Sequence, residues 1–348
     1  MFSVFVIWFV VAFLTSFFAA SIIKRIAIRF DIIDYPSLER KVHKKPVALL
    51  GGAAIYFSVF VSVAILLSKS NALTGGEITT FHYAGFLLGG LILMIGGYID
   101  DKYDLPPRVS IVAPVLASLV VIGFGIEVDK LTNPFGGVIV LESWQSDFLV
   151  FAWLMVVMYT TKFLDGLDGL ATGISSIGAL MIMLLSLSLA FFQPDVALLS
   201  AICLGAMLGF LLWNIHPASI FLGEGGSTFV GYIVGVLAVI SGGKLATALL
   251  VLGIPLMDVI WIITRRFRKK GFLQIFKADR KHLHHRLLDL GWSQKSIVLG
   301  YLALATSFGG AALFLQSREK LVALLILVFI MFTLAHLLVK SEKREHCP

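Results

Sequence analysis

The chain alternates between long apolar runs and short polar segments. A helix of about 17–25 apolar residues is long enough to cross the hydrocarbon core of a bilayer. Eleven such runs occur, at about 3–23, 47–67, 81–99, 109–126, 147–163, 174–192, 196–213, 227–241, 245–263, 296–315 and 321–339. The pattern predicts an all-α, polytopic membrane protein with one integral domain over 1–340 and a short polar cytoplasmic tail at 341–348.

The composition agrees with a membrane protein. Of the 348 residues, 58% are hydrophobic and only 14% are charged, whereas about 25% are charged in typical soluble domains. The run from Phe2 to Ile23 is too long for a signal-peptide core and lacks a basic segment before it, so we expect a retained first span. Cys203 lies in an apolar run and Cys347 in the tail, and no disulfide is predicted.

The distribution of basic residues predicts the orientation of the chain. With eleven spans, one side of the membrane receives only five of the 28 lysines and arginines, namely Lys69, Lys130, Lys244, Arg318 and Lys320. The positive-inside rule then makes the other side cytoplasmic, with the N-terminus outside and the C-terminus inside. In a membrane protein this distribution matters more than the net charge of +7, and no nucleic-acid partner is expected.

Acidic and imidazole side chains gather on the same predicted cytoplasmic side, in the segments between the spans. They are Asp31, Asp34, His43, Asp100, Asp101, Asp104, Asp165, Asp168, Glu224, Asp279, His282, His284 and His285. The predicted outer loops also carry acids but no such combination. Glycine and proline around Asn133–Gly137 predict turns there and a small hairpin.

The stretch FLDGLDGLATG at 163–173 places two carboxylates between two apolar runs. Acids next to the membrane core are costly and mark functional sites when they have a partner. Asp165 and Asp168 are three residues apart, so on a helix they would share a face and could point at one ligand. The alternative is a polar helix end that carries two acids without a function.

The segment DDKYD, from Asp100 to Asp104, directly follows the third apolar run. Adjacent carboxylates repel each other unless a cation or a proton lies between them. Magnesium takes one or two protein carboxylates and completes its shell with phosphate oxygens and water. Asp100 and Asp101, together with Asp165 and Asp168, therefore suit metal-assisted phosphate chemistry, and a carboxylate outside the metal shell could act as general base.

Two further segments predict phosphate binding. Glu224 is followed by Gly225, Gly226 and Ser227 at the start of an apolar run, where free helical N–H groups could receive a phosphate. The segment at 278–291 predicts a short helix with Asp279 as its cap and Gly291 as its stop.

The histidines of that second segment also suit an anion. On the predicted helix, His282 and His285 would share a face while His284 points elsewhere, and no cysteine lies near, so a closed zinc site is disfavoured. A basic helix next to acids better suits a diphosphate. The stretch at 40–52 adds cations, with binding of anionic lipid as the alternative.

Taken together, these motifs resemble the polyprenyl-phosphate N-acetylhexosamine-1-phosphate transferases, most closely the WecA/TagO-like branch and more distantly the MraY enzymes. The resemblance covers RKVHKKPVALLGG, DDKYD, FLDGLDGLATG, the Asn214–Ser227 loop, PLMD at 255–258, RRFRKKG and ADRKHLHHRLLDLG. It implies transfer of a sugar-1-phosphate, GlcNAc by default, from a UDP-N-acetylhexosamine to undecaprenyl or another polyprenyl phosphate. UMP is released, and Mg²⁺, or Mn²⁺ in its place, is required.

The resemblance also implies roles for individual residues. Asp100 and Asp101 would deprotonate or orient the lipid phosphate, and Asp165 and Asp168 would lie around the diphosphate. The metal ligands would be Glu224, Asp168 and Asp101, and the contacts to substrate would be Lys44, Lys162, Asn214, Phe221, Gly223, Arg280, His282, His284 and His285. The site would face the cytoplasm at the inner or plasma membrane and serve the first membrane step of a cell-surface polymer, such as lipopolysaccharide or teichoic acid. A homodimer is a further expectation.

The sequence departs from the family pattern in two motifs. Glu224 stands where the family usually has aspartate, and Tyr159 and Lys162 stand where it tends to have asparagines. Lys162 could neutralise a diphosphate oxygen, pair with an acid or reduce metal loading. Two other functions therefore stay open: a non-catalytic binder of polyprenyl phosphate or UDP-sugar, and a transporter, whose buried acids would mark a pathway.

Overall fold

The computed structural model describes the backbone of residues 2–36, 45–242, 244–270 and 282–345, and the side chains of these residues except at 2, 262–263, 265–270 and 334–345. The helices are α1 (Phe2–Arg29), α2 (Gly51–Lys69), α3 (Thr80–Tyr103), α4 (Pro107–Ser110), α5 (Val112–Gly123), α6 (Ser143–Leu164), α7 (Leu170–Leu187), a 3₁₀ turn η1 (Leu189–Phe191), α8 (Pro194–Asn214), α9 (Gly223–Ile240), α10 (Leu245–Lys270), α11 (Leu283–Asp289), α12 (Gln294–Phe314) and α13 (Ser317–Glu345). Two short hairpins pair β1 (Ile33–Asp34) with β2 (Val47–Ala48), and β3 (Lys130–Thr132) with β4 (Val138–Val140).

Each predicted apolar run falls on a helix, because backbone inside a bilayer must satisfy its own hydrogen bonds. In the described ranges, eight helices are long and apolar enough to cross a membrane: α1, α2, α3, α6, α7, α8, α9 and α12. The run at 109–126 is instead divided into α4 and α5, after a break at Pro106. The protein is a mostly helical, polytopic membrane protein, while the count of eleven spans and their orientation stay predictions. Helix α13 continues to Glu345, beyond the residue at which the polar tail was expected to begin.

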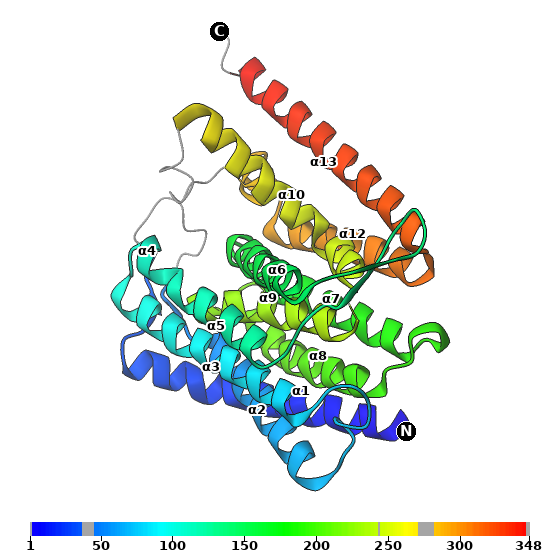
Figure 1. Ribbon diagram of the computed structural model, residues 1–348. Coiled ribbons are helices and arrows are strands. Elements are labelled where there is room, and N and C mark those ends of the chain that lie inside the picture. The colour runs from blue at the N-terminus through cyan, green and yellow to red at the C-terminus, as the bar shows by residue number, and fades with distance from the viewer. Residues whose placement is uncertain (1, 37–44, 243, 271–281, 346–348) are drawn as a thin grey trace.

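Helix α9 lies at the centre of the bundle and is almost entirely buried. It packs against α2, α3, α6, α7, α8 and α10, while α1 covers α2 and α8 on one side and α13 covers α10 on the other (Figure 1). Two close helix contacts are made through glycine. A Cβ atom on Gly97 of α3 would lie 2.1 Å from the Cα of Gly225, and one on Gly52 of α2 would lie 2.1 Å from the Cα of Gly226. Small residues at both points let α2 and α3 approach the start of α9.

Replacing Gly97 with alanine should therefore separate α3 from α9. We expect a destabilisation of about 1–3 kcal/mol, the usual cost of overpacking, measured as a lower midpoint of thermal unfolding in detergent. Gly300 on α12 is the matched control, because a Cβ atom there has no neighbour within 4 Å among the described residues. Gly300→Ala should leave the midpoint equal or slightly higher. Equal midpoints for both variants would contradict this packing.

The connections of the bundle gather at its two ends. At one end, Ala48 of β2 forms a bridge with Ile220, which joins the segment after α1 to the segment after α8. At the other end, the β3–β4 hairpin confirms the predicted hairpin and contacts the start of α13, where the Arg318 guanidinium donates to the carbonyls of Pro134 and Phe135 at 2.7 and 3.0 Å. Those candidate functional residues that the structure describes lie at the first end. Cys203 is a free, buried thiol of α8, and Cys347 lies outside the described residues.

Candidate active site

The two adjacent acids at the end of α3 have different partners. Asp100 accepts the Leu105 N–H at 3.0 Å with one oxygen and the Ser110 hydroxyl with the other. Asp101 accepts the backbone N–H of Glu224 at 2.9 Å. Successive helical residues point about 100° apart, so one turn of α3 contacts both α4 and the start of α9.

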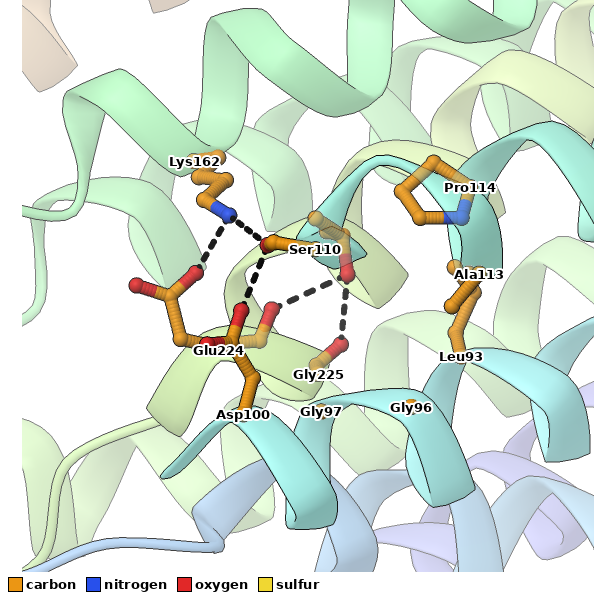
Figure 2. A pocket seen from close by; sticks show the side chains of 11 residues that line it. Leu93, Gly96, Gly97, Asp100, Ser110, Ala113, Pro114, Lys162, Glu224 and Gly225 are labelled. Atoms are coloured by element: carbon orange, nitrogen blue, oxygen red, sulfur yellow. Dashed lines mark hydrogen bonds and ion pairs between the residues drawn. The ribbon is translucent and has the colours of Figure 1, made fainter. Parts of the chain in front are cut away.

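Lys162, at the end of α6, lies between these partners. Its ammonium is 2.6 Å from Oε2 of Glu224 and donates to the Ser110 hydroxyl at 3.0 Å. Figure 2 shows the resulting group, in which Lys162 connects to Glu224 directly and to Asp100 through Ser110. Four separate segments of the chain thus supply one cluster of charges, and Ser110 is a member that the sequence analysis missed.

The start of α9 differs from the predicted phosphate cradle. The helix begins at Gly223, and the Glu224 N–H is already bonded to the Asp101 carboxylate. Gly225 and Gly226 are used for helix packing, as described above. Gly223 has a positive φ of 74°, which favours glycine. A Cβ atom there would also clash with the Asp101 carboxylate, so the absence of a side chain at Gly223 leaves room for that carboxylate.

Asp165 and Asp168 lie in the link between α6 and α7. The prediction that they share a helical face is wrong, because α6 ends at Leu164 and α7 begins only at Leu170. Asp168 lies 2.7 Å from Nδ1 of His216 and accepts the Ala218 N–H at 3.0 Å. His216 was not among the predicted site residues, although it belongs to the loop after Asn214 that the motif comparison covered.

Asp165 lies among other negative charges. Its partial burial, and then the charges of Glu224 and Asp168, raise the pKa of the Asp165 carboxyl to about 8. Carboxylates from α9 and from the α6–α7 link therefore act on one another, and a divalent cation would relieve their repulsion.

Hard carboxylate oxygens are the donors that magnesium prefers, so the residue types fit this ion. Within the described residues, however, no three aspartate, glutamate, histidine or cysteine side chains form a ready metal site. Magnesium typically takes only one or two protein carboxylates, so the remaining ligands would come from substrate and water.

Asn214 and Phe221 were predicted to lie near a nucleotide. In the structure, their hydrogen bonds connect the loops around the site. The Asn214 side chain accepts the Gly169 N–H and the Thr172 hydroxyl, both at 3.2 Å, and donates to the Ile220 carbonyl at 3.1 Å. It therefore fixes the α6–α7 link to the α8–α9 link. The Phe221 N–H donates to the Ala48 carbonyl at 2.8 Å.

The histidine segment is arranged differently from the predicted helix. Helix α11 begins at Leu283, so His282 precedes it and the expected shared face with His285 is wrong. The His282 ring stacks with those of Phe163 and His284, at centroid distances of 5.8 and 5.5 Å. The predicted stop is confirmed, because α11 ends at Asp289 and Gly291 has a φ of 85°. Asp279, Arg280 and Lys44 lie outside the described residues.

His284 contacts the acidic link directly. A Cβ atom on Gly166 would lie 2.6 Å from its Nε2, so the imidazole packs against the backbone between Asp165 and Asp168. The ring is 1% exposed, and neither nitrogen has a hydrogen-bond partner among the described residues. Burial, and then the neighbouring imidazoles of His285 and His282, keep the pKa of His284 well below its usual value. His284 is therefore neutral near pH 7, and either nitrogen can still bind a ligand.

Asp258 of α10 is a third residue, after Ser110 and His216, whose place in the site was missed. Its carboxylate lies 2.8 Å from Nδ1 of His282 and accepts the Leu283 N–H at 2.9 Å, so it fixes the ring and starts α11. The sequence analysis named it only within the PLMD motif.

Replacing Asp258 with asparagine should weaken this control of His282. The amide oxygen can still accept the Leu283 N–H, but it does not carry the charge that fixes the proton on Nδ1. We expect the sugar-phosphate transfer that the sequence resemblance implies to slow about 10–100-fold, as for other carboxylates that orient a histidine. If Asp258 acts by orienting His282, the pH profile of the rate should shift while the unfolding midpoint stays unchanged. Asp289→Asn, at the end of the short helix α11, is the control, and equal rates for both variants would remove Asp258 from the site.

The fold and this end of the bundle define a polytopic membrane protein with an acid- and histidine-rich site suited to phosphate groups. The profile of glycosyl transferase family 4 matches residues 83–242. Full-length relatives include the "Probable undecaprenyl-phosphate N-acetylglucosaminyl 1-phosphate transferase" of Bacillus subtilis, which is 32% identical over 92% of this chain and 88% of its own. The "Decaprenyl-phosphate N-acetylglucosaminephosphotransferase" of Mycolicibacterium smegmatis is 33% identical over 85% and 79%. The chain belongs to this family of polyprenyl-phosphate N-acetylglucosaminyl 1-phosphate transferases, which confirms the resemblance in the sequence.

Proposed function

We propose that this protein transfers N-acetylglucosamine 1-phosphate from UDP-N-acetylglucosamine to a polyprenyl phosphate and releases UMP. One observation carries the proposal: acids from α3, from the α6–α7 link and from α9 lie at one end of a membrane bundle, in a chain similar over most of its length to enzymes named for this reaction.

In this reaction, an oxygen of the acceptor phosphate attacks the β-phosphorus of the donor. The bond between that phosphorus and the oxygen of the UMP leaving group breaks, and the sugar phosphate remains on the lipid. Positioning and charge stabilisation provide most of the rate in phosphoryl transfer. Asp101 and Asp100 orient the acceptor phosphate, and the neutral His284 donates a hydrogen bond to the donor diphosphate, while His282, held by Asp258, stacks on the His284 ring.

One or two of the carboxylates of Asp101, Asp168 and Glu224 would hold Mg²⁺, or Mn²⁺ in its place, and substrate and water would supply the other ligands. When bound, the ion neutralises charge on the diphosphate and on the leaving UMP. Asp165 lies beside these carboxylates. The negative charges of Glu224 and Asp168 help to raise the pKa of Asp165 and so favour its protonated form.

The site end is proposed to face the cytoplasm at the inner or plasma membrane. The support is the basic composition of the connections on that side, which include the segments 24–46 and 264–295. The other end has fewer basic groups. One of them is Arg318, which contacts the β3–β4 hairpin.

A panel of UDP-sugars tests the function. Purified protein is supplied with undecaprenyl phosphate, Mg²⁺ and one UDP-sugar at a time, and the mass of the lipid product is measured. A product carrying one N-acetylhexosamine phosphate, formed fastest from UDP-N-acetylglucosamine, is expected. Nucleotide binding without product at any Mg²⁺ or Mn²⁺ concentration would make the protein a binding relative. Substrate flux into liposomes without lipid product would make it a transporter.

A further inference from the structure

The Lys162 ammonium has an unusual position for a cation in a site expected to bind metal. Its side chain is 19% exposed, and it lies 2.6 Å from Glu224, a carboxylate that we propose as a metal ligand. Lysine carries a compact charge on a flexible stem, so its ammonium can exchange one anionic partner for another.

Lys162 is linked indirectly to both acids of α3, to Asp100 through Ser110 and to Asp101 through Glu224. Because the Ser110 hydroxyl gives its hydrogen to Asp100, its oxygen is free to accept from Lys162. On the other side, the backbone of Glu224 donates to Asp101. One ammonium therefore offsets part of the negative charge of the Asp100, Asp101 and Glu224 carboxylates.

The space beside the ammonium is small. The cavity bordered by Asp100, Ser110, Lys162 and Glu224 holds about one water molecule (Figure 2). Magnesium usually keeps several waters in its shell. A divalent ion on the Glu224 oxygen that faces Lys162 would lie close to the ammonium, and the repulsion between the two cations disfavours binding of both to that oxygen.

We propose that Lys162 is an internal cation that competes with the divalent ion for Glu224, and that a diphosphate substrate resolves the competition by drawing the ammonium to its own oxygens. The substrate part of this inference rests on the proposed function, whereas the competition itself needs no substrate. Because binding is reciprocally linked, a substrate that releases Glu224 also raises the affinity for the metal.

The competition is measured by titrating purified protein with Mn²⁺ alone and following free Mn²⁺ by electron paramagnetic resonance. Lys162→Met should raise the affinity about tenfold, within the usual range for coupled sites. Lys162→Arg keeps the charge and should stay near wild type. Lys102→Met is the matched control, because it removes one positive charge beside Asp101 from an exposed side chain that contacts the rings of Tyr98 and Tyr103.

The Mn²⁺ affinity of Glu224→Gln provides an independent test, because it does not depend on the stability of the Lys162 variants. In the otherwise unchanged protein it should alter Mn²⁺ affinity by less than about twofold, since Lys162 already occupies the carboxylate. In the Lys162→Met background it should abolish the gain, as a double-mutant cycle requires. An unchanged or weaker affinity in Lys162→Met, or a large loss in Glu224→Gln alone, would overturn the inference. Absence of lipid product from the wild-type protein would instead count against the proposed function.

Discussion

Asp101→Asn is expected to lower sugar-phosphate transfer by on the order of 10²–10³-fold, the usual effect of removing one preorganised electrostatic group from an active site. Asparagine keeps an oxygen that can accept the Glu224 N–H, so the contact between α3 and α9 is preserved and only the charge is lost. The unfolding midpoint should therefore change little while the rate falls. Asp100→Asn and Asp168→Asn should also remove most of the activity.

Asp104→Asn is the control for this series. Asp104 belongs to the same acidic segment but is exposed and caps α3 in a left-handed conformation with φ 49°, which asparagine also adopts readily. Its activity should equal that of the wild type. Full turnover in the Asp100, Asp101 and Asp168 variants would remove the acidic cluster from the chemistry.

Chelation of divalent ions is expected to abolish transfer, and the affinity for the added ion should depend on pH. The pKa of the Asp165 carboxyl is raised to about 8, so at neutral pH the group holds a proton. An ion bound at the neighbouring Asp168 would repel that proton, so binding of the ion favours release of the proton. The apparent affinity should therefore rise by up to about tenfold per pH unit below pH 8 and level off above it.

Titrations with Mn²⁺ between about pH 6 and pH 9 test this dependence without turnover. Asp165→Asn has no proton to lose at this position, so its affinity should follow pH less steeply than that of the wild type. An affinity that falls as pH rises from about 6 to 8 would contradict the proposed arrangement.

The apolar runs could be located from the sequence because a membrane imposes a simple rule on the backbone. Helices α1, α6 and α8 lie where hydropathy placed them, and the turn residues around Asn133–Gly137 predicted the hairpin. The types of residue in the candidate site could be predicted for the same reason, since acids and imidazoles rarely collect by chance beside lipid-embedded segments.

The pairings within the site could not be predicted, because they depend on contacts between distant segments. Asp258 and His282 are 24 residues apart, and Asp101 contacts the backbone of Glu224 across 123 residues. Helical spacing also misled where the chain leaves the helix, as at Asp165 and before His282. The sequence showed Lys162 and Glu224 as two separate departures from the family pattern. Only the structure shows that these two side chains form an ion pair.

The central claim is that this site moves a sugar together with its phosphate. UDP-N-acetylglucosamine labelled with ³²P in the β-phosphate, incubated with the protein, polyprenyl phosphate and Mg²⁺, tests that claim most directly. The label is predicted to enter the lipid, leaving unlabelled UMP in solution. Label that stays in a water-soluble nucleotide while the lipid acquires the sugar, or acquires nothing, would contradict it.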